Sequence, residues 1–257
     1  LALGPKLDKT FSLFIMGMGS FGKSTLVNAL IGKRVAETDV FPKTWKIDIF
    51  EAATTENQVE IYFKDGSSKK YSRQKAIEYI AGEEEKIETS KDKRDDKYYS
   101  LKRSLDSVEA KEELKEKLTK EIVYQSPIVE VHWPCKVGEN SLLNKFNIVD
   151  TPGLFQEDSS EKTKQDLRSY YHDADGVLWM LDATTLASQQ PKKLLDNLDK
   201  ALAKIDGKTD NVVGVLNKID LVRRKNPDNV ERVINQAREI FADYFLDVVP
   251  VSAQEAI

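Results

Sequence analysis

The sequence lacks several features that would place the chain in other classes of protein. No apolar run reaches the roughly 18–20 residues needed to cross a bilayer, which excludes a transmembrane helix within these 257 residues. The single cysteine, Cys135, cannot form an internal disulfide, and no zinc-type cluster of cysteine and histidine is present. Acidic residues exceed basic ones only slightly, 43 against 39, so we expect no nucleic-acid partner.

Charged residues, in contrast, are abundant and unevenly spread. They make up 32% of the chain, yet 24 of the 39 residues from 83 to 121 are charged. We expect a flexible stretch at 83–97 and then a long solvent-facing helix from 101 to 122 with one narrow apolar stripe. Two interpretations of this insertion stay open: a solvated segment without a partner, or a docking surface. The stripe would consist of Leu101, Leu105, Val108, Leu114 and Leu118.

The rest of the chain alternates between short apolar runs and helical patterns. This alternation predicts an α/β fold with a mostly parallel central sheet, covered on both faces. The turn signal Asp65-Gly66 predicts additional antiparallel strands around it. We therefore expect a single domain over residues 1–257, extended by antiparallel strands and by the charged helical insertion at 83–121. Strands are predicted at 11–16, 46–52, 59–63, 128–132, 146–149, 176–181, 211–216 and 247–251, and helices at 23–31, 74–80, 160–171, 191–204 and 228–245.

A phosphate-binding motif lies where the first predicted strand meets the first predicted helix. Residues 17–24 read GMGSFGKS and fit the pattern G-x-x-x-x-G-K-[S/T]. Glycines let backbone N–H groups surround phosphates, and the helix N-terminus adds a positive dipole. We expect Lys23 to reach the β- and γ-phosphates and the Ser24 hydroxyl to bind Mg²⁺. The predicted phosphate-binding residues are Gly19, Ser20, Phe21, Gly22, Lys23, Ser24 and Thr25.

A second motif, Asn-Lys-Ile-Asp at 217–220, follows a predicted parallel strand and selects guanine. The Asp220 carboxylate can accept hydrogen bonds from the ring N–H and the amine of guanine, a donor pair that adenine lacks. The stem of Lys218 can lie along the base, and Asn217 can tie this loop to the phosphate loop. After the last predicted strand, the backbone of Ser252 and Ala253 could contact the guanine carbonyl.

A third motif, Asp-Thr-Pro-Gly at 150–153, also ends a predicted strand. We expect Asp150 to hold Mg²⁺ and the N–H of Gly153 to contact the γ-phosphate. Thr44, between the first helix and the next strand, suits a switch residue that binds Mg²⁺ and the γ-phosphate, and Thr38 is its rival. The predicted metal ligands are therefore Ser24, Thr44 and Asp150.

Together these motifs resemble the dynamin-like GTPase family, in particular its bacterial branch. The resemblance rests on residues 17–32, 39–44, 150–154, 174–183 and 217–220, and it covers nearly the whole chain outside the charged insertion. It implies hydrolysis of GTP to GDP and phosphate, with GTP or GDP, Mg²⁺ and a monovalent cation as cofactors.

The resemblance also assigns roles in hydrolysis. The family lacks the catalytic glutamine of small GTPases, and the apolar Leu154 after the third motif agrees with this. Ser20 matches the family's cation-contacting serine, and Thr44 matches the threonine that positions water. Gly19 stands where eukaryotic dynamins have glutamine, so that contribution is absent or replaced. The predicted catalytic residues are Ser20, Lys23, Thr44 and Gly153.

The family further implies a homodimer across the nucleotide and membrane contact through a helical stalk. A stalk is absent from these residues, so we expect the chain to be part of a longer, cytoplasmic protein that is peripheral to a membrane and remodels it. Two alternatives remain. One is a regulatory switch GTPase of the Era-like type in a ribosome or stress pathway, and the other is a GTP-binding scaffold with low turnover.

Overall fold

The computed structural model describes residues 10–17, 20–36, 45–139, 141–151, 174–187 and 211–256. The chain forms two compact units, Leu1–Thr55 with Trp133–Ile257, and Glu56–His132. The second unit is larger than the predicted insertion at 83–121, because it also contains the antiparallel strands that precede it.

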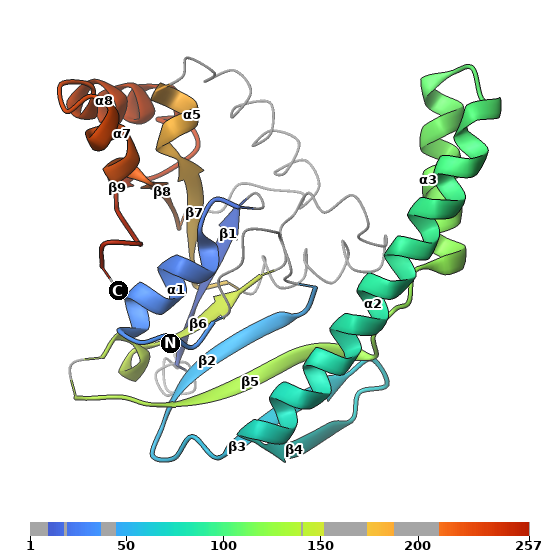
Figure 1. The fold of residues 1–257 in the computed structure, drawn as a ribbon. Helices are drawn as coiled ribbons and strands as arrows, with labels where there is room; N and C mark the ends of the chain where they lie inside the picture. The colour runs from blue at the N-terminus through green and yellow to red at the C-terminus, as the bar shows by residue number, and fades with distance from the viewer. Residues whose placement is uncertain are drawn as a thin grey trace, which may run out of the picture. The chain divides into compact units, whose positions relative to one another are not determined.

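The first unit is built on a mostly parallel sheet, with its strands in the order β2-β6-β1-β7-β8-β9 (Figure 1). β1 pairs in parallel with β6 and β7, β7 with β8, and β8 with β9, whereas β2 is antiparallel to β6. This confirms the predicted α/β fold with a mostly parallel central sheet. The strands are β1 (Phe11–Gly17), β2 (Ile47–Ala53), β6 (Phe146–Asp150), β7 (Gly176–Asp182), β8 (Val212–Asn217) and β9 (Val248–Pro250).

Different helices cover the two faces of this sheet. One hydrophobic core joins Phe14, Trp179 and Leu216 of the strands to buried residues of three helices, α5, α7 and α8. Side chains alternate along a strand, so Ile15 points to the opposite face, where α1 contacts β1 and β6 and buries Val27. The helices are α1 (Lys23–Ile31), α5 (Ala183–Ala187), α7 (Ile219–Lys225) and α8 (Asn229–Ile240), with a 3₁₀ turn, η3, at Leu142–Asn144.

Three of these helices differ from the predictions. The helix expected at 228–245 is shorter, because α8 ends at Ile240 and the chain turns there. Phe241 and Phe245 after this end pack into the core, with their ring centroids 5.7 Å apart, so their apolar pattern reflects burial rather than further helix. The short helices α5 and α7 were not predicted.

The second unit contains an antiparallel sheet, as predicted. β3 (Gln58–Phe63) pairs with β4 (Ser68–Ser72) on one side and with β5 (Ile128–Lys136), which continues into the first unit, on the other. The β3–β4 turn contains Gly66 with φ 82°, a left-handed conformation that glycine adopts without a Cβ clash.

Two helices complete this unit, α2 (Arg73–Leu101) and α3 (Val108–Ile122), which run side by side as a hairpin (Figure 1). The prediction of a flexible stretch at 83–97 is therefore wrong, since these residues lie inside α2. The single helix expected from 101 to 122 is also wrong, because the 3₁₀ turn η2 (Lys102–Ser104) interrupts it. The Ser107 side chain caps α3 by accepting a hydrogen bond from the backbone N–H of Ala110 at 3.0 Å.

The buried stripe of α2 shows why the sequence pattern was misread. Its buried residues are Ala76, Ile80, Glu83, Ile87 and Arg94, at helical spacing but with two charged members. A search for apolar periodicity does not detect such a stripe.

The apolar stripe predicted within residues 101–122 is wrong at two positions. Leu101 and Val108 are 42% and 66% exposed, whereas Leu118 is buried at 2%. The helices predicted at 160–171 and 191–204 lie outside the described residues. Among the helices that are described, none has both the length and the apolar composition needed to cross a bilayer.

Candidate nucleotide-binding site

The β1–α1 turn has a backbone that requires glycine. Gly17 has φ 137°, and a Cβ there would lie 2.9 Å from the Cβ of Met180. Gly22, with φ 89°, is the N-cap of α1, and a Cβ there would collide with the side-chain amide of Asn217. Ser20 is left-handed as well, with φ 64°. The chain therefore curls tightly before α1, as a phosphate-binding turn does.

Lys23, the first residue of α1, is only 7% exposed. Its Nζ donates a hydrogen bond to the carbonyl of Gly17 at 3.4 Å. Burial lowers the pKa of Lys23, and the nearby Asp150 carboxylate opposes this shift. A buried ammonium at this turn is suited to meet an anionic ligand.

Asp150, the last residue of β6, is 2% exposed and accepts a hydrogen bond at Oδ2 from the Ser24 hydroxyl at 2.9 Å. Burial raises its pKa to about 6, while the charge of Lys23 acts in the opposite direction. Its other oxygen, Oδ1, is buried and has no hydrogen-bond partner among the described residues. An unsatisfied buried carboxylate oxygen is unfavourable unless a ligand completes it.

These oxygens fit a magnesium ion. Carboxylate and hydroxyl oxygens are the ligands that Mg²⁺ prefers, and this ion usually takes one or two carboxylates together with substrate phosphates. No cluster of three or more His, Cys, Asp and Glu side chains that could hold a metal occurs in the described parts of the chain. The orphaned Oδ1 of Asp150 beside Ser24 is thus suited to an ion that arrives with a nucleotide.

Supporting residues of this carboxylate were missed from the sequence. Asp48 of β2 is the register partner of Asp150, and its charge helps to raise the pKa of Asp150. Lys46 forms an ion pair with Asp48, and the indole N–H of Trp133 donates to Asp48 Oδ1 at 2.7 Å. The pairing of strands brings Asp48 beside Asp150 and Trp133, which are distant from it in sequence, so no local motif could have revealed this group.

The loop after β8 contacts the phosphate-type turn directly. The Asn217 side-chain amide donates to the Phe21 carbonyl at 2.9 Å, and its oxygen accepts from the N–H of Ala253 at 3.2 Å. The Ser252 hydroxyl donates to Asp220 Oδ1 at 2.9 Å, and Asp220 is 4% exposed. Ser252 and Ala253 therefore lie against Asp220 and Asn217 of the guanine motif, while their expected contact with the guanine carbonyl stays a prediction.

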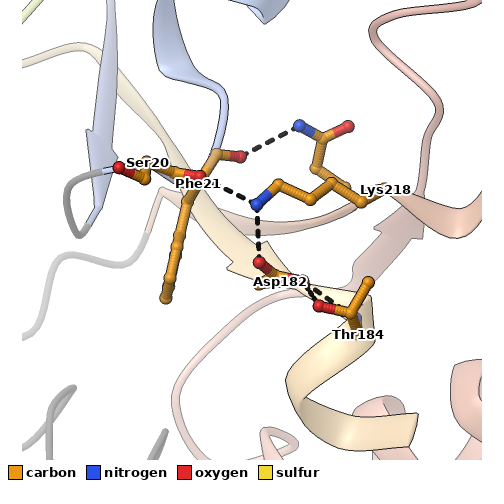
Figure 2. A network of polar contacts seen from close by, with 6 residues as sticks. Ser20, Phe21, Asp182, Thr184 and Lys218 are labelled. Atoms are coloured by element: carbon orange, nitrogen blue, oxygen red, sulfur yellow. Dashed lines mark hydrogen bonds and ion pairs between the residues drawn. The ribbon is translucent and has the colours of Figure 1, made fainter. Parts of the chain in front are cut away.

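Lys218 makes a second connection to the turn (Figure 2). Its Nζ donates to the Ser20 carbonyl at 2.8 Å and forms an ion pair with Asp182 Oδ2 at 2.7 Å. Asp182 had no predicted role. The available signal was its position as the last residue of β7, because the carboxyl ends of parallel strands share one edge of the sheet.

Most of the predicted site residues thus lie at one edge of the sheet. The three others, Gly19, Thr44 and Gly153, lie outside the described residues, as do Thr38 and Leu154. Those that the structure describes are Ser20, Phe21, Gly22, Lys23, Ser24, Thr25, Asp150, Asn217, Lys218, Asp220, Ser252 and Ala253.

A mostly parallel sheet with this glycine turn and this guanine-type loop defines a GTPase of the P-loop class. The family model described as "Dynamin family" matches residues 13–219, so the chain belongs to the dynamin family. It is the GTPase domain of a dynamin-like protein.

Two curated bacterial relatives are similar over nearly the whole chain. "Dynamin-like protein 2" of Campylobacter jejuni is 27% identical over 250 residues, covering 97% of this chain and 32% of that protein. "Bacterial dynamin-like protein" of Nostoc punctiforme is 27% identical over 253 residues, covering 95% and 30%. The chain therefore spans about a third of the length of these relatives.

A solved structure agrees with the fold. It is an oligomerised bacterial dynamin pair, described as a mechanism for long range sensing and tethering of membranes. It aligns with 95% of this chain and 31% of its own, with a TM-score of 0.51 and 20% sequence identity. At this identity the similarity concerns the fold.

Proposed function

We propose that this domain binds GTP with Mg²⁺ at the described edge of the sheet and hydrolyses it. In the longer protein, nucleotide-dependent dimerisation would couple hydrolysis to membrane remodelling. The observation that carries the proposal is the pair of bonds from Asn217 to Phe21 and from Lys218 to Ser20. They join a phosphate-type turn to a guanine-type loop, so one ligand can occupy both.

The phosphate end depends on the start of α1. The Lys23 ammonium is held inside the turn, where β- and γ-phosphates would replace the solvation that it lost on burial. Backbone N–H groups at the N-terminus of α1 add further donors. Positioning and charge stabilisation of this kind supply most of the catalysis of phosphoryl transfer.

The metal would be held by Ser24 and Asp150, with Thr44 as the expected third protein ligand. When bound, Mg²⁺ neutralises charge on the phosphate oxygens. Asp150 contributes its buried Oδ1, which needs a partner, while its Oδ2 accepts from the Ser24 hydroxyl and so orients the carboxylate.

The base end depends on Asp220. Its carboxylate is buried and oriented by the Ser252 hydroxyl, so it can accept hydrogen bonds from guanine along a fixed direction. An adenine would leave this carboxylate without its donors, which gives strong discrimination between the two bases.

The remaining catalytic roles rest on the family resemblance. Ser20 is proposed to contact a monovalent cation, Thr44 to position the attacking water, and Gly153 to contact the γ-phosphate. The relative solved as an oligomerised pair supports dimerisation of this domain, and its description supports peripheral membrane association of the longer protein.

Single-turnover hydrolysis of radiolabelled GTP tests the site. We expect Lys23→Ala to slow the reaction at least about 100-fold, because a preorganised charge at the phosphates is lost. Lys33→Ala is the matched control: Lys33 follows α1 and donates to the Lys136 carbonyl outside the site. Tight GTP binding with no hydrolysis in the wild type would instead indicate a scaffold.

Two further measurements test the coupling. The hydrolysis rate per protein should rise with protein concentration if dimers are the active form. Flotation of the full-length protein with liposomes should show membrane binding. A rate that is independent of both concentration and lipid would contradict the proposed coupling and leave GTP binding unaffected.

A further inference from the structure

The Lys218 ammonium bridges three parts of the fold (Figure 2). From the loop after β8 it donates to the Ser20 carbonyl of the β1–α1 turn at 2.8 Å, and at 2.7 Å it meets Asp182 Oδ2 at the end of β7. The Asp182 carboxylate is 9% exposed and the Lys218 side chain 29%, so this ion pair is only partly screened by water.

The two residues that this hydrogen bond joins both have an unfavourable left-handed backbone conformation. Ser20 and Lys218, with φ 64° and 65°, are the two non-glycine residues with positive φ among the described positions. Side chains of L-residues adopt this region with a penalty, so surrounding contacts must hold it. The bond from Lys218 Nζ to the Ser20 carbonyl joins these two residues directly.

Asp182 is itself held firmly. Its Oδ1 accepts hydrogen bonds from the backbone N–H of Thr184 at 2.8 Å and from the Thr184 hydroxyl at 2.6 Å, at the start of α5. In the sheet register, Asp182 is also the direct partner of Asn217. One oxygen is therefore fixed by α5, which leaves the other aimed at Lys218.

We infer that Asp182 is a positioning residue for the nucleotide: it aims the Lys218 ammonium at the Ser20 carbonyl and thereby fixes the guanine loop against the phosphate loop. The inference rests on the proposed function, because the two loops matter only if one nucleotide spans them. Loss of the Asp182 charge leaves Lys218 with one anchor fewer, so the loops separate more readily and the nucleotide dissociates faster.

The test is the dissociation rate of a fluorescent GDP from the chain, measured by stopped flow. We expect Asp182→Asn to raise this rate roughly tenfold, less than truncation of a fully buried charge pair would cause, because the Lys218 side chain is 29% exposed. Thr184→Val keeps the charge and removes one orienting hydroxyl, so a rise of about threefold is expected. It also serves if Asp182→Asn folds poorly.

Asp175→Asn is the matched control. Asp175 stands at the other end of β7, where its Oδ2 accepts from the Ser12 N–H at 2.8 Å, and it should leave the dissociation rate unchanged. A rise as large as that of Asp182→Asn would overturn the inference, because any aspartate next to β7 would then have the same effect.

A double-mutant cycle separates positioning from general stability. Lys218→Met keeps the stem and lacks the ammonium, so adding Asp182→Asn to it should produce little further loss if Asp182 acts through Lys218. Fully additive effects would overturn the inference. A wild type that binds no guanine nucleotide would refute the proposed function instead, whereas normal binding with an unchanged Asp182→Asn rate refutes only the inference.

Discussion

Each of the two compact units buries a carboxylate, and the two carboxylates differ in whether their oxygens are hydrogen-bonded. Asp150 in the first unit and Glu83 in the second are both 2% exposed. Glu83 accepts hydrogen bonds from Lys86 and Ser126 at 2.7 Å and from the Tyr124 hydroxyl at 2.9 Å. Asp150 Oδ1, in contrast, has no hydrogen-bond partner in the parts of the chain that the structure describes.

The pKa values follow the same division. Burial raises the pKa of Asp150 to about 6, since the charges and the hydrogen bond nearby do not offset it. Burial also acts to raise the pKa of Glu83, but its bonds to Lys86, Ser126 and Tyr124 outweigh this, so its pKa lies below the usual value.

The difference indicates which charge serves the fold and which serves a ligand. Glu83 belongs to a saturated network that fixes α2 against residues 124–126, while Asp150 keeps a buried oxygen that no described residue satisfies and that a ligand could complete. A buried polar group with all its hydrogen bonds made stabilises a structure. A buried polar group that lacks a hydrogen-bond partner is a candidate for ligand binding.

Of the substitutions that test the contrast between Asp150 and Glu83, Asp150→Asn should have the largest effect, which is a loss of GTP hydrolysis. We expect single-turnover GTP hydrolysis to fall at least about 100-fold, because the neutral amide cannot replace the carboxylate as a metal ligand. Without nucleotide, the melting temperature should change little, because relief of the buried carboxylate is offset by the loss of its attraction for the buried Lys23 ammonium. Calorimetry and a hydrolysis assay on the same preparation measure both.

Asp175→Asn supplies the comparison for this variant, since it removes an aspartate charge near the surface of the same unit. If Asp150→Asn lowered the melting temperature by several degrees in the absence of nucleotide, the carboxylate would have to be counted as structural, and the contrast with Glu83 would fail.

Glu83→Gln should have the opposite consequences to Asp150→Asn: it should lower the stability of the fold and leave nucleotide binding unchanged. An amide cannot accept from three donors as the carboxylate does, so the free energy of unfolding should fall by about 2–3 kcal/mol. The dissociation rate of GDP should not change. Urea denaturation monitored by circular dichroism measures the stability, and Glu85→Gln, an exposed glutamate of the same helix, should stay within about 0.5 kcal/mol of the wild type.

Sequence reasoning succeeded where chemistry is local. The bounds of α1 and the motifs at 17–24 and 217–220 were predicted because the turn, the helix start and the loop each need particular residue types at fixed spacing. It failed at α2, where Glu83 and Arg94 occupy core positions. The partners that permit their burial are distant in sequence: Ser126 lies 43 residues beyond Glu83, and Thr119 lies 25 residues beyond Arg94.

The same limit explains why Asp182 was missed. Its position directly after the strand predicted at 176–181 indicated that it lies at the carboxyl edge of the sheet, but it did not identify a partner. Only the pairing of β7 with β8 brings it beside Asn217 and so within reach of Lys218. Contacts of this kind depend on sheet register, which the residue pattern of one strand does not determine.

Lowering the pH should give the smallest effect, and it tests the charge of Glu83 selectively. The pKa of Glu83 is lower in the folded protein than the ordinary value of 4.5, so its contribution to stability is complete above pH 4.5 and is lost as the pH falls through the folded value. The difference in unfolding free energy between wild type and Glu83→Gln should therefore be constant from about pH 5 to 8 and shrink below about pH 4.5. Urea titrations of both proteins across this range measure it. A difference that persists unchanged to pH 3.5 would show that the Glu83 charge is not what the network stabilises, and that Glu83 acts through packing alone.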